Sequence, residues 1–536
     1  MQGSTRSTRR WLWLVIGMML ISMGLAVPAL AEEKPQYGGV MKVALAGDPP
    51  SLDMHQETTF LVKIPLSTCY NTLVIFDPHG FPKIIGDLAE SWESSKDGMT
   101  WTFKLHQGVK FHDGSELTSA DVKASWEKIV WPPEGTISTR KSYYGMIKSI
   151  DAPDPAAVVF HLNYPSASFL AMLAYPHNFI YAKKYLDQDV NYYKTNVMGT
   201  GPFKFKNWVR GSYLEVERNP DYFKPGLPYL DGIKYFSIKD LSASAKAVRT
   251  GRVDTELRGF PPAESEAIKK QMGDQVVIRY PRSISHWGIA FNVNQKPFDD
   301  ERVRQAMSLA INRYEMAEVI GPLTGLETVG GLIHPDAEWA LTPEELQTLP
   351  GFGRDYEANL KEAKRLMTEA GYPNGFKTKL LNRAVKLPYI DYGVYLITAW
   401  KKIGVEAEHN LEESASWSKS RQTGNFAVAA DPYGSAGTGD PDQIMTKFIT
   451  GGSANYGGFS DPEVDRLFEL QKVELDRQKR VDLVKQMQKI IIGKGYFLPG
   501  LYWTRIEARS VHIKNYEPHH SHHMNRRFED VWLAQK

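Results

Sequence analysis

Residues 88–129 read LAESWESSKDGMTWTFKLHQGVKFHDGSELTSADVKASWEKI, and no other segment of the 536-residue chain is so densely patterned. Asp97 and Gly98 form a turn dipeptide between two β-like runs. After the turn, large apolar side chains alternate with Thr and Lys, which puts them on one face of a strand. The pattern predicts a half-buried β-hairpin whose core-facing residues are Trp101, Phe103 and Leu105.

The second part of this segment predicts a short continuation of the sheet and then a helix. Gln107 and Gly108 turn the chain, the alternation resumes at Val109 and Phe111, and an Asp-Gly turn ends it. Thr118, followed three residues later by Asp121, has the spacing of a capping box at a helix start. Apolar contacts from this helix are expected from Ala124, Trp126 and Ile129.

This ordered set of elements resembles the signature of the family five extracellular solute-binding proteins, the peptide- and nickel-binding components of ABC importers. The matching strings are AESW, the D-G turn, FKL, KFHDG, LTSADV and the Trp-containing helix. The resemblance implies an α/β fold: a two-lobed periplasmic binding protein of type II with an extra subdomain inserted in the first lobe. It also implies a protein that closes two lobes around a solute and performs no covalent reaction.

Further strings extend the resemblance over nearly all of the chain after residue 32. They are GGVMKVAL with GDPPSLD, YNTL, GTGPFKF, RNPDYF, GRVD, and FNVN with PFDD. The glycines of GTGPF do not form a phosphate loop motif, because no G-x-x-x-x-G-K-[ST] string is present. By resemblance the expected organisation is a signal peptide at 1–31, lobe I at 32–70, 198–285 and 501–536, an inserted subdomain at 71–197, and lobe II at 286–500.

The N-terminus has the pattern of an export signal. Three Arg residues precede an apolar run over 11–27, and the Ala-x-Ala ending at Ala31 is typical of a signal peptidase site. The mature chain is therefore expected to begin at Glu32 and to reside in the periplasm; an uncleaved membrane anchor is the alternative. Arg9 and Arg10 also approach the twin-arginine export pattern, so Sec and twin-arginine export both stay open.

Charge and cysteine content exclude several classes of protein. Removing residues 1–31 takes away three Arg and no acid, so the net charge falls from +2 to −1. Nucleic acid is therefore not an expected partner. Cys69 is the only cysteine, which rules out an internal disulfide, and no Cys follows the cleavage site as in a lipoprotein. We expect Cys69 to be a small buried apolar residue.

The resemblance also implies where a ligand binds. In peptide-binding relatives an acid near a Gly-rich loop holds the ligand's ammonium group, and a basic residue before the helix at Pro388 holds its carboxylate. Here the aromatic-x-x-Asp upstream of the loop ending is absent, so Asp431 is the substitute, with a turn role before Pro432 as the alternative. The full expected set is Glu57 and Thr58 from the loop after residue 54, Arg383 (with Lys386 as a rival), Tyr389, Trp417, Asp431, Tyr433 and Gly434.

Surface exposure or core packing is an alternative role for some of these residues. Arg383 is alternatively a solvated surface cation, and Trp417 a core side chain. His519, His520, His522 and His523 are suitable metal ligands, but the surrounding tail resembles the ordinary family ending, so neither a metal site nor a cofactor is expected. A secreted hydrolase is the rival class, and the G-x-S-x-G and H-E-x-x-H motifs are absent.

The leading prediction is therefore a monomeric periplasmic receptor. It would capture a peptide or similar small polar solute by hinge closure and deliver it to the permease subunits of an ABC importer in the inner membrane. A receptor for a non-peptide ligand, such as a nickel or other metal chelate or a sugar, is the alternative within the same fold.

Overall fold

The computed structural model describes residues 33–57, 59–281, 285–434, 439–452, 454–518, 524 and 527–535. The predicted signal peptide and Thr58 lie outside the described residues, as do the four histidines at 519–523. The chain divides into two compact units, Met1–Gln36 and Tyr37–Lys536, and the second holds all the elements below. Among the described residues, no helix is both long and apolar enough to cross a membrane.

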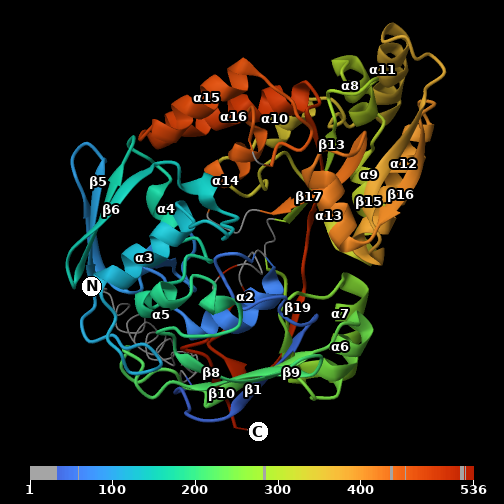
Figure 1. The fold of residues 1–536 in the computed structure, drawn as a ribbon. Helices are drawn as coiled ribbons and strands as arrows, with labels where there is room; N and C mark the ends of the chain where they lie inside the picture. The colour runs from blue at the N-terminus through green and yellow to red at the C-terminus, as the bar shows by residue number, and fades with distance from the viewer. Residues whose placement is uncertain are drawn as a thin grey trace, which may run out of the picture. The chain divides into compact units, whose positions relative to one another are not determined.

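A seven-stranded sheet combines strands from residues 40–45, 203–279 and 507–510 of the second unit (Figure 1). Its strand order is β12-β19-β11-β1-β10-β9-β8. Helices α6 and α7 pack at its β12–β19 end, where apolar side chains form a separate small core. The elements are β1 (Val40–Leu45), α2 (Phe60–Leu66), β8 (Phe203–Val209), β9 (Tyr213–Arg218), β10 (Gly232–Ser237), α6 (Leu241–Arg249), β11 (Thr255–Glu256), α7 (Pro262–Met272), β12 (Val276–Arg279) and β19 (Glu507–Ser510).

A four-stranded antiparallel sheet contains the hairpin predicted from residues 88–129. Strands β4 and β5 pair around the Asp97-Gly98 turn, and Gly98 has the left-handed φ of 69° that favours glycine. Helix α3 begins with the predicted capping box between Thr118 and Asp121. Its strands, in the order β4-β5-β7-β6, are β4 (Ala89–Ser94), β5 (Thr100–Leu105), β6 (Ile147–Asp154) and β7 (Ala157–Leu162). The same part of the chain holds a separate pair, β2 (Val74–Phe76) with β3 (Ile84–Gly86), and the helices α3 (Ser119–Val130), α4 (Phe169–Leu173) and α5 (Lys183–Gln188).

The predicted continuation at Val109 and Phe111 is reduced to one bridge pair, Lys110 with Glu116. Tight turns on both sides leave too few residues for a longer ladder, although both apolar side chains are buried as the alternation predicts.

The glycines of GTGPF have a packing role. The backbone N–H of Gly201 donates to the carbonyl oxygen of Cys69 at 3.0 Å, and a methyl group on Gly199 or Gly201 would collide with the Cys69 backbone. Cys69 itself is fully buried, as expected from the sequence, and burial raises the pKa of its thiol to about 12.

A six-stranded mixed sheet with order β14-β18-β13-β17-β15-β16 carries the largest hydrophobic core. Its β15 runs parallel to β16 and β17, whereas the other pairs are antiparallel. The elements are β13 (Ser285–Phe291), α8 (Glu301–Leu309), α9 (Arg313–Thr324), β14 (Leu326–Val329), α10 (Pro343–Gln347), α11 (Tyr356–Glu369), β15 (Lys377–Arg383), α12 (Asp391–Lys401), β16 (Glu406–Glu412), α13 (Ser414–Gln422), β17 (Val428–Gly434), α14 (Asp442–Met445), α15 (Pro462–Val473), α16 (Arg477–Gly493) and β18 (Phe497–Trp503).

The chain passes between the two large sheets twice, from β12 to β13 and from β18 to β19. The predicted boundary at residue 500 falls inside β18. A last short pair, β20 (Ile513–Lys514) with β21 (Trp532–Leu533), follows the second passage.

One strand prediction was wrong at both ends. The apolar run at 426–430 and the glycines that follow Asp431 predict a short strand that leads into a Gly-rich loop, but β17 runs from Val428 to Gly434. Residues 431–434 pair with 285–288 of β13, so this ladder extends the strand through Pro432. Asp431 and Tyr433 therefore belong to a strand and share one of its faces.

Candidate functional site

The parallel strands of the six-stranded sheet end together at one edge. Arg383, the last residue of β15, pairs with Glu412, the last residue of β16, and β17 runs parallel on the other side of β15. In open α/β sheets, ligands bind beyond the carboxyl ends of such strands. The position of Arg383 therefore suits a ligand contact.

Arg383, Tyr389 and Trp417 form one group at this edge. Arg383 Nη1 donates to the Tyr389 hydroxyl at 3.3 Å, and the Tyr389 and Trp417 rings meet edge to face at a centroid separation of 5.7 Å. The Arg383 guanidinium lies 5.3 Å from the Tyr389 ring centroid and 5.8 Å from that of Trp417. Three of the predicted ligand residues thus lie together, and cation–π contacts hold the Arg383 side chain in place.

Asp431 is fully buried behind this group and is held by two cations. Its Oδ1 accepts from Arg421 Nη1 at 2.8 Å, and its Oδ2 accepts from Lys447 Nζ at 2.6 Å. Burial lowers the pKa of Lys447 and the charge of Arg421 lowers it further, whereas Asp431 raises it. Both carboxylate oxygens of Asp431 are therefore already hydrogen-bonded. This geometry favours a role for Asp431 in holding Arg421 and Lys447 in place over direct contact with a ligand ammonium group.

Tyr433 and Gly434 end β17, two and three residues after Asp431. The Tyr433 hydroxyl donates to the carbonyl oxygen of Leu332 at 2.6 Å, and its ring packs edge to face on Phe497. Burial raises the pKa of the Tyr433 phenol well above its ordinary value. Gly434 pairs with Ser285 at the end of the β13–β17 ladder. Tyr433 thus packs in the core of the six-stranded sheet.

Glu57 comes from the loop before α2, and its side chain is half-buried. Burial and the nearby charge of Asp53 raise the pKa of the Glu57 carboxyl. Arg140 fixes this loop by donating to the carbonyl oxygens of Met54 and His55, both at 2.7 Å, and of Glu57 at 3.1 Å. Thr58, the other predicted residue of this loop, lies outside the described residues.

The structure adds residues that sequence reasoning missed, chiefly Arg258 and Arg421. Arg421 stands four residues after Trp417 on α13, and its guanidinium lies 4.4 Å from that ring, so helical spacing was a usable signal. Arg258 follows β11 of the other large sheet, and nothing in the local sequence connects it to Arg383. The same holds for Trp287 on β13 and Trp503 on β18, whose rings meet edge to face at 5.0 Å.

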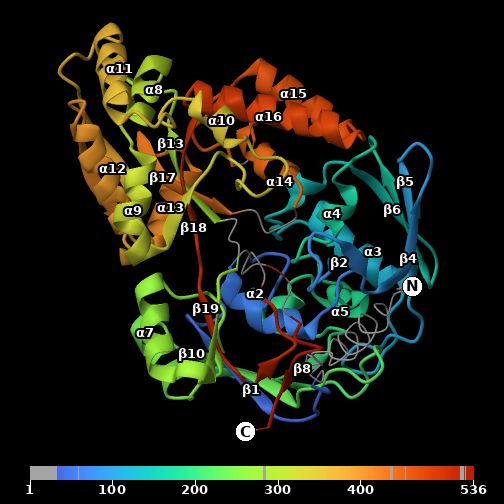
Figure 2. The ribbon, with the colours of Figure 1, turned by 180° about the vertical axis from the view of Figure 1, so that it is seen from behind.

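The acids of Gly439-Asp440-Pro441-Asp442 have a structural role. Arg480 on α16 binds both oxygens of Asp440, at 2.7 and 2.9 Å, and Oδ1 of Asp442 at 2.9 Å. Asp442 Oδ2 accepts from Ser168 at 2.6 Å. Ser168 precedes α4, which lies beside α14 in both views (Figure 2). This bond joins the subdomain of the four-stranded sheet to that of the six-stranded sheet.

Ser168→Ala is expected to lower the free energy of unfolding by about 1–2 kcal/mol, because it removes a buried hydrogen bond to a carboxylate. Urea unfolding measures this change. Ser91→Ala, at an exposed position of β4, is the matched control and should change stability by less than about 0.5 kcal/mol. Equal values for the two variants would show that the bond between the subdomains does not stabilise the protein.

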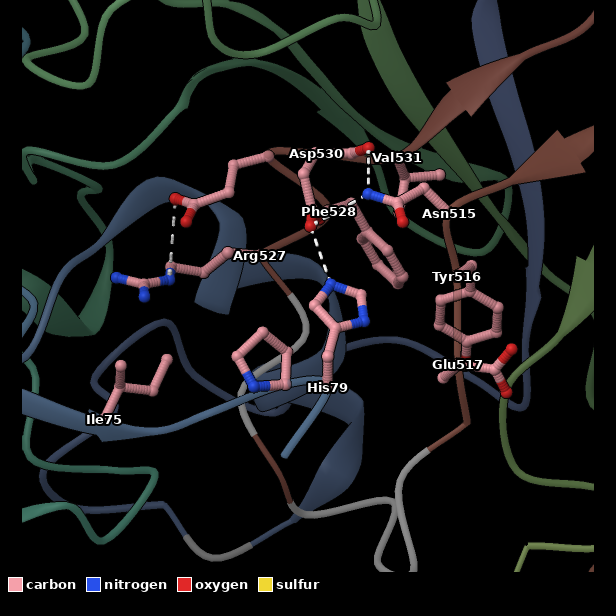
Figure 3. A pocket seen from close by; sticks show the side chains of 11 residues that line it. Ile75, His79, Asn515, Tyr516, Glu517, Arg527, Phe528, Asp530 and Val531 are labelled. Atoms are coloured by element: carbon pink, nitrogen blue, oxygen red, sulfur yellow. Dashed lines mark hydrogen bonds and ion pairs between the residues drawn. The ribbon is translucent and has the colours of Figure 1, made fainter. Parts of the chain in front are cut away.

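A surface pocket near the C-terminus is a poor ligand site (Figure 3). It lies between the segment around His79 and residues 527–531, where His79 Nε2 and Asp530 Oδ2 are 2.8 Å apart. Its volume is about 40 Å³, against several hundred for typical small-molecule sites. Its lining residues come from 75–79 and 515–531 and include no member of the Arg383 group.

No set of three or more His, Cys, Asp or Glu side chains is arranged to hold a metal ion in the described part of the chain. The histidines at 519–523, the one cluster that the sequence suggested, are outside that part.

Two large sheets joined by two chain passages, with Arg383 and its aromatic neighbours at the strand ends, define a two-lobed solute-binding protein of the type II periplasmic fold. The chain belongs to the bacterial extracellular solute-binding proteins, family 5: the model of that family's middle region matches residues 83–456. The resemblance seen in the sequence is thereby confirmed.

Similar proteins support the same class. The chain is 29% identical to the glutathione-binding protein GsiB of Escherichia coli (strain K12), over 93% of this chain and 95% of that protein. It is also 29% identical to the heme-binding protein A of Haemophilus influenzae, over 83% of this chain and 84% of that protein. The solved structure of the ABC transporter-associated periplasmic binding protein DppA from Helicobacter pylori, in complex with peptide STSA, is similar with a TM-score of 0.79 at 27% identity. That match covers 93% of this chain and 99% of that chain.

Proposed function

We propose that this protein is exported to the periplasm, captures a peptide or similar small polar solute between its two lobes, and delivers it to the permease of an ABC importer. The lobes are centred on the seven-stranded and six-stranded sheets, and the four-stranded sheet is the subdomain inserted in the first lobe. The family and the similar structures are binding proteins, and the two chain passages between the sheets provide a hinge.

The observation that carries this proposal is the Arg383 group at the carboxyl edge of β15. Arg383 is oriented by Tyr389 and Trp417, and a planar guanidinium held in this way suits bidentate recognition of a carboxylate. Glu57, on a loop that Arg140 fixes, is the better-placed acid for a ligand ammonium group, because Asp431 is engaged by Arg421 and Lys447.

A receptor for a non-peptide solute is the second candidate. The names of the similar proteins include glutathione, heme and a peptide as ligands, so the framework accepts several chemistries. Because Asp431 is already bound by Arg421 and Lys447, a solute without a free ammonium group would lose no contact at Asp431, and this favours the non-peptide candidate.

Native mass spectrometry of the protein purified from a periplasmic extract tests the function. We expect a bound small molecule that is released on denaturation, and its identification separates peptide from non-peptide solutes. Bound solute lost in Arg383→Met but retained in Arg354→Met, a substitution in the loop before α11, would support the site. Absence of any small molecule, together with cleavage of a peptide mixture above a denatured control, would overturn the function in favour of a hydrolase.

A further inference from the structure

Arg258 is an arginine from the first large sheet that lies among aromatic rings. It lies two residues after the end of β11, and its guanidinium lies 5.4 Å from the ring centroid of Phe60 and 5.8 Å from that of Trp503. Its backbone is fixed because Arg505 Nη1 donates to the Arg258 carbonyl oxygen at 3.3 Å. The side chain is half-buried, and no carboxylate of the described residues lies within 4.0 Å of its charged nitrogens.

Arg258 and Arg383 reach the same row of rings from different sheets. Trp503 contacts Trp287 at 5.0 Å, and Trp287 contacts Tyr389 at 5.5 Å, both edge to face. Tyr389 in turn accepts the hydrogen bond from Arg383. Burial lowers the pKa of Arg258, Glu256 and Tyr389 act to raise it, and the like charge of Arg383 lowers it further. Arg258 and Arg383 therefore place like charges at two points of one row of rings.

The buried polar atoms in this row that lack a partner are all hydrogen-bond donors. They are Arg258 Nε, Trp287 Nε1 and Trp417 Nε1, for which the described residues supply no acceptor. Guanidinium and indole groups donate and do not accept. A ligand that completes this row must therefore present acceptors, and anionic oxygens are the strongest acceptors for a guanidinium.

Two acids near the row, Asp431 and Glu256, have other partners. Asp431 is shared by Arg421 and Lys447. Glu256 accepts the backbone N–H of Gly259 at 2.6 Å, and burial raises the pKa of its carboxyl to about 7, so at neutral pH it is only partly ionised.

We propose that the solute carries two carboxylate groups, one bound by Arg383 of the second lobe and the other by Arg258 of the first. This assignment rests on the proposed function and narrows its substrate class to small dicarboxylates, including peptides with an acidic side chain. A solute with two carboxylates would attract both guanidinium groups, which otherwise carry like charges. Both attractions form only when both lobes contact the solute. The same interaction therefore favours the closed arrangement of the lobes.

Isothermal titration calorimetry of the mature protein, freed of bound solute by unfolding and refolding, tests the assignment. The probes are glutathione, γ-glutamylglycine and the matched tripeptides Ala-Ala-Glu and Ala-Ala-Gln. We expect the dicarboxylates to bind and Ala-Ala-Glu to bind about 10–100-fold more tightly than Ala-Ala-Gln. Arg258→Met should reduce this ratio to about 2-fold or less. Arg252→Met, at an exposed position, should preserve it.

A failure of folding is separated from a failure of binding by two measurements. Circular dichroism must show an unchanged fold in Arg258→Met. Arg258→Lys should retain part of the preference, because it keeps the charge but loses the planar fork. Equal binding of Ala-Ala-Glu and Ala-Ala-Gln would overturn the dicarboxylate assignment and leave the importer function intact. Absence of binding by every dicarboxylate would also overturn it, and the native mass spectrum would then decide the function separately.

Discussion

Asp431→Asn is expected to lower the free energy of unfolding by about 3–5 kcal/mol. The carboxylate is fully buried, and its two oxygens bind Arg421 at 2.8 Å and Lys447 at 2.6 Å. An amide of the same shape removes the negative charge, leaving two buried cations that repel each other in a low-dielectric interior.

Urea unfolding at neutral pH and a titration with the solute identified from the periplasm together test this role. The matched control is Asp299→Asn, at an exposed position before α8, which should change stability by less than about 0.5 kcal/mol. If Asp431 instead bound a ligand ammonium group directly, the variant would lose affinity while its free energy of unfolding stayed near that of the control.

Local patterns in the sequence were sufficient for the hairpin and its helix. The Asp97-Gly98 turn, the alternation through Leu105 and the Thr118–Asp121 capping box depend on residues close in the chain, and the structure confirms them.

The candidate site depended on partners distant in the chain. Whether Asp431 faces a ligand or the core depends on the pairing of β17 with β13 and on Lys447. Glycines downstream suggested a loop, but the β13 partner extended the strand, so Asp431 and Tyr433 share one face. Arg258 is connected to the Arg383 group only by the ring contacts of Trp503 and Trp287, which join residues distant in the chain and which no local periodicity predicts.

Between pH 7.5 and 5.5 the free energy of unfolding is expected to fall by about 2 kcal/mol, as the net of two opposing effects. Burial lowers the pKa of His55 and His286 to about 3 and that of His112 to about 4. Below about pH 6.5 the unfolded chain binds protons at these sites and the folded chain does not. The free energy of unfolding therefore decreases as the pH decreases. The three histidines together account for a loss of about 4 kcal/mol over this interval.

Glu256 acts in the opposite direction. Burial raises the pKa of its carboxyl to about 7, so as the pH falls from 7.5 to 5.5 the folded chain takes up a proton that the unfolded chain does not bind. Stability from this group therefore rises by about 2 kcal/mol as the pH falls, which offsets half of the histidine effect.

Two variants separate these contributions, because they should change the pH dependence with opposite sign. Glu256→Gln should increase the loss between pH 7.5 and 5.5 to about 4 kcal/mol. His286→Phe, which keeps a ring against Tyr502 and Tyr433, should reduce the loss by about 1.4 kcal/mol. Urea unfolding over a pH series measures both. A change in packing shifts the free energy of unfolding equally at every pH. Only a change in its slope against pH therefore reports on the protonation of Glu256 and His286. Unchanged slopes in both variants would contradict the assignment of these groups as buried titrating sites.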